Sequence, residues 1–184
     1  MVDLPWTWLR QVHGTDVVVV RAPGEHAGAR ADAAVTATPG AALAVGAGDC
    51  APVVLLGQGA VGVVHAGWRG LVAGVIPAAV AALRALGAAD IRAVLGPCIR
   101  PGCYEFGAAD LDRAAAVLGD GVRGRTATGA PALDVPAAVA SALGAAGVRR
   151  IEDVGVCTAC SAGHWSYRAR GDRQRQALVA WLGQ

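Results

Sequence analysis

The sequence is poor in charged and aromatic side chains, and it contains no lysine at all. Charged residues make up 16% of its 184 residues and aromatic residues 4%, whereas hydrophobic residues make up 54%. All sixteen basic residues are arginines spread along the chain, and the fourteen acidic residues leave a net charge of only +2. This balance excludes a charge-dominated disordered chain. It also provides no strong field that would attract nucleic acid or a membrane surface.

Long uninterrupted apolar runs are absent as well. The uncharged stretches 33–48 and 70–83 are broken by glycine and proline, which indicates core elements and not membrane spans. Asp3 and Pro5 stand where a secretory signal would need a basic start and an apolar run. Five cysteines are an odd number in a chain too long to need disulfide staples. We therefore expect a single cytoplasmic domain over residues 1–184, monomeric and without nucleic-acid or membrane partners.

Short β-branched runs and helical patterns mix along the chain. The patterns predict strands at 17–21, 51–56, 59–65, 91–95 and 154–157. Helices are predicted at 71–86, 108–118 and 135–143, and residues 174–182 fit either a helix or a strand. Gly57-Gln58-Gly59 predicts a hairpin turn, and Asp134 is a plausible N-cap. The mixture favours an α/β or α+β fold with mixed sheets over a purely parallel, doubly wound one.

Three short segments place metal-binding side chains beside glycine near predicted strand ends. They are QVHG with His13, GDCAP with Cys50 and HAGWRG with His65. Neutral imidazole and thiolate are good zinc ligands, and three protein ligands with one open position are typical of catalytic zinc. Each residue alone is more often structural, since a strand-end histidine is usually hydrogen-bonded and a lone cysteine is usually a small core residue. Together they indicate a metal site, although spacing does not establish that they converge.

Several arginines and one aspartate are further candidates. Arg69 follows Trp68 in a glycine-rich turn, and its planar guanidinium suits a phosphate ion, the alternative being a structural ion pair. Arg168 and Arg175 are candidates for substrate binding, the alternative being ordinary surface or fold-supporting arginines. Asp49 either orients a ligand histidine or caps a turn.

The remaining cysteines allow several interpretations. Cys103 is either a nucleophile working with His65 or part of the pocket lining, and the lining is favoured because no lowered pKa is evident from sequence. Cys157 and Cys160 have the CxxC spacing of a redox pair or of half a zinc site. Because the sequence contains no second CxxC, two structural thiols are the favoured interpretation.

The motifs also occur together in a recognisable order. QVHG, RADA at 30–33 with TP at 38–39, DCAP, HAGWRG, GPCIRPGCYE and SYRARGDRQR follow one another between residues 9 and 182. In this combination the sequence strongly resembles the laccase-domain family, known as multicopper polyphenol oxidases and grouped with cytotoxic-necrotising-factor-like proteins. The resemblance implies an α+β fold, a four-layer α/β/β/α sandwich with mixed sheets. It also implies a zinc ion held by His13, Cys50 and His65.

The activity that the resemblance implies is phosphorolysis of adenosine, inosine, guanosine and methylthioadenosine, together with deamination of adenosine. Zinc on the three ligands would activate water for attack on carbon 6 of adenine, and an arginine-held phosphate would attack the ribose. With the three ligands, Arg69 is then the fourth catalytic residue, and the substrate contacts are Arg69, Arg168, Arg175 and Cys103.

The sequence also departs from the family pattern in two places. The family usually has an opening strand and a Ser-x-Arg-x-Gly-Gly-x-Ser motif before QVHG, which this sequence lacks, so we expect an N-terminally short domain. The usual Gly-Arg after SYR stands here as Gln174-Arg175. Two alternatives stay open: a polyphenol oxidase with Cu²⁺ instead of Zn²⁺, and an inactive metal-binding module. A multicopper centre needs more histidines than the four present.

Overall fold

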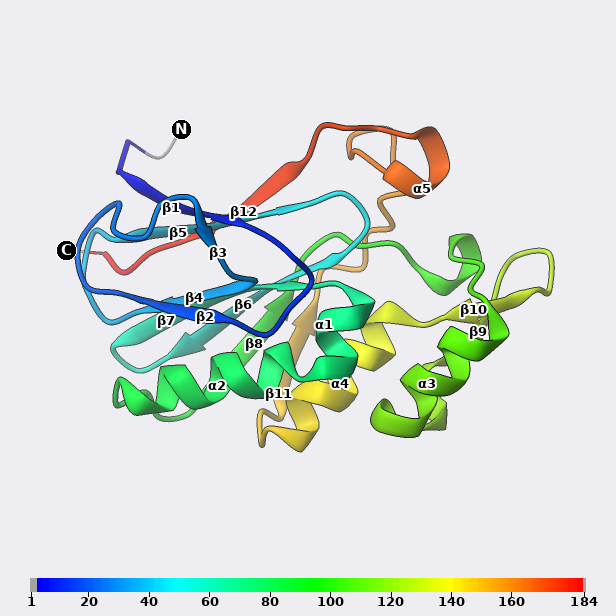
Figure 1. The fold of residues 1–184 in the computed structure, drawn as a ribbon, viewed down its shortest axis with the longest axis horizontal. Coiled ribbons are helices and arrows are strands. Elements are labelled where there is room, and N and C mark those ends of the chain that lie inside the picture. The colour runs from blue at the N-terminus through cyan, green and yellow to red at the C-terminus, as the bar shows by residue number, and fades with distance from the viewer. Residues whose placement is uncertain (1–2, 184) are drawn as a thin grey trace.

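The computed structural model describes residues 3–183, which form two stacked β-sheets with helices on one side (Figure 1). One sheet has four strands in the order β12-β5-β1-β3, and the other has six in the order β11-β8-β6-β7-β4-β2. Both sheets are mixed, because parallel pairs such as β1–β5 lie beside antiparallel pairs such as β5–β12. A separate antiparallel pair joins β9 to β10.

The elements have the following bounds. The strands are β1 (Trp6–Arg10), β2 (Val17–Val20), β3 (Ala29–Arg30), β4 (Ala33–Thr36), β5 (Ala42–Ala47), β6 (Ala51–Gly57), β7 (Ala60–Ala66), β8 (Arg92–Leu95), β9 (Arg123–Arg125), β10 (Pro131–Leu133), β11 (Arg150–Asp153) and β12 (Gln176–Ala180). The α-helices are α1 (Trp68–Ala73), α2 (Val75–Ala85), α3 (Ala108–Leu118), α4 (Val135–Ala145) and α5 (Tyr167–Arg170). None of the helices in residues 3–183 is long and apolar enough to cross a bilayer.

The hydrophobic core has two parts, one on each face of the six-stranded sheet. The part between the two sheets includes Leu9, Leu43 and Val63, and the part facing the helices includes Leu55 and Ile76. Strand β7 is buried along its whole length. A strand covered on both faces has no polar face, which explains why the sequence of β7 is apolar almost throughout.

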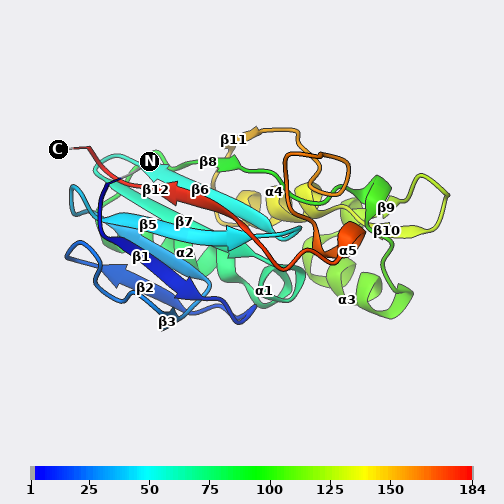
Figure 2. The ribbon, with the colours of Figure 1, turned by 90° about the horizontal axis from the view of Figure 1, so that it is seen from above.

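The predicted α+β fold with mixed sheets is confirmed. Within residues 3–183, α1, α2 and α4 pack against the six-stranded sheet, whereas the short helix α5 stands apart from them (Figure 1). Figure 2 shows the four-stranded sheet from above with no helix over it, so the described residues build three of the four predicted layers. On this sheet Trp8 is 53% exposed.

Most predicted elements lie close to their expected positions. The turn after Gly57 joins β6 to β7 as an antiparallel hairpin, and the Asp134 side chain caps α4 by accepting a hydrogen bond from the Ala137 amide. Residues 174–182 contain a strand, β12, which pairs with β5. The predicted helix 71–86 is instead two helices, because Gly74 takes a left-handed conformation (φ 100°) and ends α1.

The predicted strand at 154–157 is wrong. The strand here is β11, four residues earlier, and it pairs in parallel with β8. Regular pairing stops after Asp153: the Val154 amide still donates to the Leu95 carbonyl, and Cys157 makes an isolated bridge with Cys98. The apolar run Val154–Val156 suggested a strand. Pairing with β8 sets the register instead, and the strand ends at Asp153, opposite Leu95, where β8 ends.

Candidate metal centre

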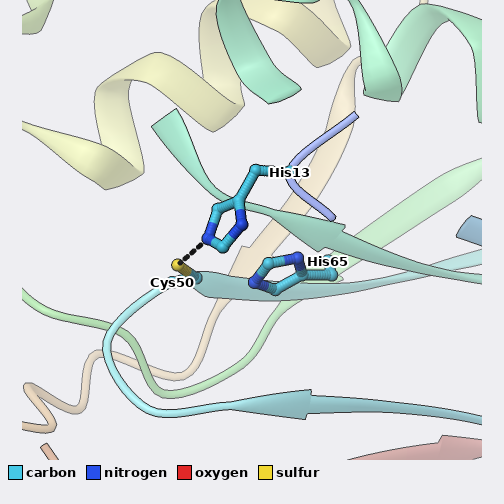
Figure 3. A group of neighbouring side chains, drawn as sticks. All are labelled: His13, Cys50 and His65. Atoms are coloured by element: carbon cyan, nitrogen blue, oxygen red, sulfur yellow. Dashed lines mark hydrogen bonds between the residues drawn. The ribbon is translucent and has the colours of Figure 1, made fainter. Parts of the chain in front are cut away.

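Three side chains from distant segments meet at one end of the six-stranded sheet. His65 lies on β7, Cys50 directly precedes β6, and His13 lies in the loop after β1. Their ligand atoms all lie within 4.8 Å of one another (Figure 3). Cys50 Sγ is 3.8 Å from His13 Nε2, and the two imidazole rings meet edge to face with centroids 4.9 Å apart. We call these three residues the histidine–cysteine centre.

A buried carboxylate, Asp32, positions both histidines. Its Oδ1 lies 2.8 Å from His65 Nδ1 and accepts a hydrogen bond from the His13 amide at 2.9 Å. Its Oδ2 accepts from the amides of Val12 and Gly14. Burial alone would raise the pKa of Asp32, but the bonds from His65 and the three amides hold it below its usual range. Because Nδ1 of His65 is engaged, Nε2 is the nitrogen left for a metal.

The absence of a side chain at Gly67 leaves room for the candidate ligands to come together. A Cβ atom at this position would lie 2.6 Å from His13 Cδ2 and 3.4 Å from Cys50 Sγ. His13 itself has a left-handed backbone (φ 59°), which is uncommon outside glycine and is held here by the Asp32 bond. The donor set of two imidazoles and one thiolate, packed this tightly, fits a zinc ion.

Electrostatics favour the ligand form of the cysteine. Burial raises the pKa of the Cys50 thiol, but hydrogen bonds and charge from His13 and His65 outweigh it and lower the pKa to about 6. Burial lowers the pKa of His65, but Asp32 and Cys50 raise it to about 9. Between about pH 6 and pH 9, the metal-free protein therefore holds the Cys50 thiolate beside the His65 imidazolium. The thiolate is the form in which cysteine binds metals.

The histidine–cysteine centre opens into a cavity of about 500 Å³, a size that suits a small molecule. The lining residues are Gln11, His13, Gly46, Gly48, Cys50, His65, Tyr167 and Arg175. The Arg175 side chain crosses Gly48 so closely that a Cβ atom there would lie 2.8 Å from Arg175 Cδ. Arg175 Nη1 donates to the carbonyls of Asp172 and Gln174. The cavity therefore combines a metal-binding set with a guanidinium held by the backbone.

The other predicted site residues lie elsewhere. The Arg69 guanidinium stacks on the Trp68 ring, 4.6 Å from its centre, and does not line the cavity. Arg168 and Cys103 line a different cavity, of about 520 Å³. Arg168 stacks on the Tyr104 ring. Of the predicted substrate contacts, Arg175 is the one that shares a cavity with the histidine–cysteine centre.

The sequence leaves two roles open for Asp49, orienting a ligand histidine or capping a turn, and the carboxylate that contacts a histidine is that of Asp32. The Asp49 side chain has no hydrogen bond to either histidine. Its carboxylate instead accepts hydrogen bonds from Thr158 Oγ1 and the Arg168 amide, both at 2.7 Å. Sequence reasoning missed Asp32, Gln11 and Tyr167, although each lies in a quoted motif: RADA, QVHG and SYRARGDRQR, respectively.

Comparisons with known proteins agree over nearly the whole chain. A family model described as multi-copper polyphenol oxidoreductase laccase matches residues 1–183. A Streptomyces coelicolor protein named purine nucleoside phosphorylase is 44% identical over 180 residues, which cover 95% of this chain and 74% of that protein. A Mycobacterium bovis protein of the same general name is 38% identical over 179 residues, covering 95% and 71%.

Solved structures match the fold equally well. The crystal structure of the Neisseria meningitidis protein NMB0706 superposes with a TM-score of 0.88 at 31% identity, covering 98% of this chain and 76% of the other. YlmD from Geobacillus stearothermophilus gives a TM-score of 0.87 at 30% identity, covering 98% and 74%.

Proposed function

This chain belongs to the multi-copper polyphenol oxidoreductase laccase family, and we propose that within it the chain is a zinc-dependent purine nucleoside phosphorylase that also deaminates adenosine. The proposed substrates are adenosine, inosine, guanosine and methylthioadenosine. One observation carries the proposal: the histidine–cysteine centre and Arg175 face one cavity of about 500 Å³. The 44% identity to a Streptomyces protein of that name supports it. We propose a single-domain cytoplasmic monomer whose partners are nucleosides and phosphate.

The donor set supports zinc as the metal. Two imidazole nitrogens and one thiolate would hold the ion and leave one position open, as in catalytic zinc sites. When bound, the ion would supply Lewis acidity toward water. Copper-based phenol oxidation, which the family description suggests, fits the chain less well, because a multicopper centre needs more histidines than the four in the sequence.

Phosphorolysis requires the chain to hold a phosphate ion beside the ribose of the nucleoside. An oxygen of phosphate attacks carbon 1′ of the ribose, the bond to the purine breaks, and the base leaves with a proton while ribose 1-phosphate forms. We assign the phosphate contact to Arg175, whose planar guanidinium can bind two phosphate oxygens at once. Tyr167, 64% exposed at the cavity, offers a ring on which a purine can stack.

Deamination places different demands on the same cavity. Water replaces the amino group at carbon 6 of adenine, and ammonia leaves, so no phosphate is consumed. The residues it requires are the three ligands and Asp32, which fixes the His65 ring. Arg175 therefore matters more for phosphorolysis than for deamination.

A nucleoside panel tests the proposal. Zinc-loaded protein is incubated with each of the four nucleosides, with and without inorganic phosphate, and the products are separated by chromatography. We expect free base and ribose 1-phosphate only when phosphate is present, and inosine from adenosine in both conditions. Cys50→Ala should lose both reactions. Cys98→Ala should keep both, because Cys98 is buried away from the cavity.

Other outcomes would overturn the assignment. If zinc-loaded wild-type protein turns over none of the four nucleosides but binds them, the chain is a metal-binding module. If the copper-loaded protein instead consumes oxygen with a phenol, the chain is a polyphenol oxidase.

A further inference from the structure

Three of the cysteines converge outside the proposed nucleoside site. Cys103 ends a 3₁₀ turn, Pro101–Cys103, while Cys157 and Cys160 lie in the loop that follows β11. Cys103 Sγ is 3.0 Å from Cys160 Sγ, and the three sulfur atoms all lie within 4.8 Å of one another. No disulfide links them, since all five cysteines are free. We call these three residues the three-cysteine cluster.

The loop that carries Cys157 and Cys160 is fastened at several points. Thr158 is fully buried, and its hydroxyl donates to Asp49, the residue next to Cys50. Its amide donates to the carbonyl of Cys98 at 3.2 Å. Arg170 donates to the carbonyls of Thr158 and Ala159. These bonds hold the two sulfurs in place without using either of them.

The segment that carries Cys103 is tied to the same loop. Arg100 makes a two-pronged ion pair with Asp153, the last residue of β11, at 2.6 and 2.5 Å. The carbonyl of Arg100 accepts a hydrogen bond from the Cys103 amide at 2.9 Å. The two strands β8 and β11 that lead into these segments are paired. The convergence of the sulfurs is therefore built on the sheet.

The surroundings of Cys157 suit a thiolate. The backbone amides of Arg100, Cys160 and Ala159 donate hydrogen bonds to the Cys157 sulfur. Two of these amides follow Cys157 by two and three residues in the CxxC turn. Amides aimed at a sulfur stabilise a coordinating thiolate, as hydrogen bonds to ligand atoms do at other metal sites.

We propose that Cys103, Cys157 and Cys160 bind a second metal ion, a thiophilic one such as Zn²⁺ or Cu⁺. At a Zn–S distance of about 2.3 Å, two sulfurs on one tetrahedral ion lie about 3.8 Å apart. The separations here, from 3.0 Å up to at most 4.8 Å, reach that value with shifts of about 1 Å. Soft thiolate ligands select Zn²⁺ and Cu⁺ over hard cations.

One side of the three-cysteine cluster faces a cavity. Cys103 and Ala159 line the cavity of about 520 Å³ that Arg168 also lines. Cys160 is exposed. Three thiolates bring three negative charges, of which a divalent ion compensates two. A fourth ligand, from solvent or from a small thiol, can therefore reach the ion.

Titration with Co²⁺, an optical stand-in for zinc, tests this site on reduced and metal-stripped full-length protein. Thiolate-to-cobalt charge-transfer absorption increases with the number of cysteine ligands, which is three here and one at the histidine–cysteine centre. We expect wild-type protein to bind two ions per chain. Cys50→Ala should bind one ion with the stronger, three-thiolate absorption, and Cys157→Ser should bind one ion with the weaker absorption.

Two further variants control for loss of folding and for the removal of a cysteine outside both groups. Cys160→Ser changes an exposed residue, so it should fold and still lose the three-thiolate absorption. Cys98→Ala, which removes a buried cysteine outside both groups, should still bind two ions. The proposal is overturned if folded Cys50→Ala binds no Co²⁺. It is also overturned if reduced wild-type protein binds a single ion while peptide mapping of untreated protein finds a Cys103–Cys160 disulfide. Neither result depends on nucleoside turnover, so this test is independent of the proposed function.

Discussion

The histidine–cysteine centre and the three-cysteine cluster are positioned in different ways. In the first, a fully buried carboxylate fixes a ligand ring and three backbone amides, and a glycine lets the ligands close up. In the second, the three cysteines lie on loops, and the bonds that hold these loops are backbone bonds, arginine contacts and the Thr158–Asp49 bond, none of which involves a sulfur atom. The centre therefore depends on a few irreplaceable side chains, whereas the cluster spreads its support over many bonds.

Asp49 is the structural link between the two groups. It precedes Cys50, and it holds Thr158 between the two cysteines of the CxxC turn. The Arg168 amide also donates to it. A disturbance of one group can therefore reach the other through this residue.

The largest effect is expected from Asp32→Ala. The change leaves His65 and three amides without their buried acceptor, and breaking such a buried pair costs about 3–5 kcal/mol. We expect a lower free energy of unfolding in denaturant titrations and no metal at the histidine–cysteine centre. The three-cysteine cluster should keep its cobalt absorption wherever the variant is folded.

Asp32→Asn is the matched control for this prediction. Asparagine keeps the shape and one acceptor oxygen, so part of the amide network survives. We expect a smaller loss of stability than in Asp32→Ala, together with weakened metal binding at the centre. Full metal affinity in Asp32→Asn would show that the carboxylate charge has no part in orienting the ligands.

Gly67→Ala is expected to have the next largest effect. The added Cβ would lie 2.6 Å from His13 Cδ2, so the His13 ring must shift from its present position beside Cys50. Displacing the support of a ligand typically lowers metal affinity about 10–100-fold. Zinc affinity measured by competition with a chelator would show this loss.

A glycine-to-alanine substitution beside the three-cysteine cluster is the matched control for Gly67→Ala. Gly102 precedes Cys103, and a Cβ atom there would meet nothing within 4 Å. Gly102→Ala should therefore leave the affinity of both groups within about twofold. Equal losses in the two variants would show that Gly67 is not specifically required at the centre.

A third difference concerns the arginines of the two cavities. Arg175 lines the cavity of the centre, and Arg168 lines that of the cluster. A charge-assisted contact to phosphate is worth about 1.5–3 kcal/mol, so Arg175→Ala should slow phosphorolysis roughly ten- to a hundredfold. Arg168→Ala, and Arg69→Ala outside the cavity, should slow it less.

Comparing the rates of phosphorolysis and deamination in each variant distinguishes the loss of a phosphate contact from a general loss of the folded state. Arg175→Ala should keep more of its deamination than of its phosphorolysis, because only phosphorolysis uses phosphate. If Arg69→Ala loses more phosphorolysis than Arg175→Ala in a folded, zinc-loaded protein, the phosphate contact belongs to Arg69.

Motifs in the sequence pointed to the candidate metal-binding residues better than to the side chains that support them. His13, Cys50 and His65 could be named because each stands beside glycine in a short motif. Asp32 could not be separated from Asp49, because proximity in sequence favoured Asp49 whereas strand pairing brings Asp32 to His65. A buried carboxylate that accepts a hydrogen bond from a residue on a neighbouring strand leaves no local pattern in the sequence.

The three-cysteine cluster could be predicted only in part. The CxxC spacing showed two of its members, and the search for a second CxxC missed the third, which is a single cysteine from another loop. For the fold, local patterns predicted the hairpin β6–β7 and helix α3 well. Long-range pairing decided the rest, as when β8 fixed the position of β11.

The smallest predicted effect is a difference in thiol reactivity between the two groups in the metal-free protein. The pKa of Cys50 is lowered to about 6 despite burial, by its histidines. The hydrogen-bonded contact with Cys160, together with burial, raises the pKa of Cys103 to about 12. Because the thiolate is the nucleophile, alkylation at Cys50 should fall about twofold from pH 7 to pH 6 as the thiolate takes up a proton. Cys103 should react slowly at both pH values.

Iodoacetamide labelling followed by mass spectrometry of peptides measures each cysteine separately. His13→Ala removes a hydrogen-bond partner of Cys50, so the pKa of Cys50 should rise and its alkylation at pH 7 should slow. Saturating zinc should protect Cys50, because a coordinated thiolate is not free to attack. Equal labelling of Cys50 and Cys103 at pH 7 would contradict the comparison, since it would mean that neighbouring imidazoles stabilise a thiolate no better than neighbouring thiols do.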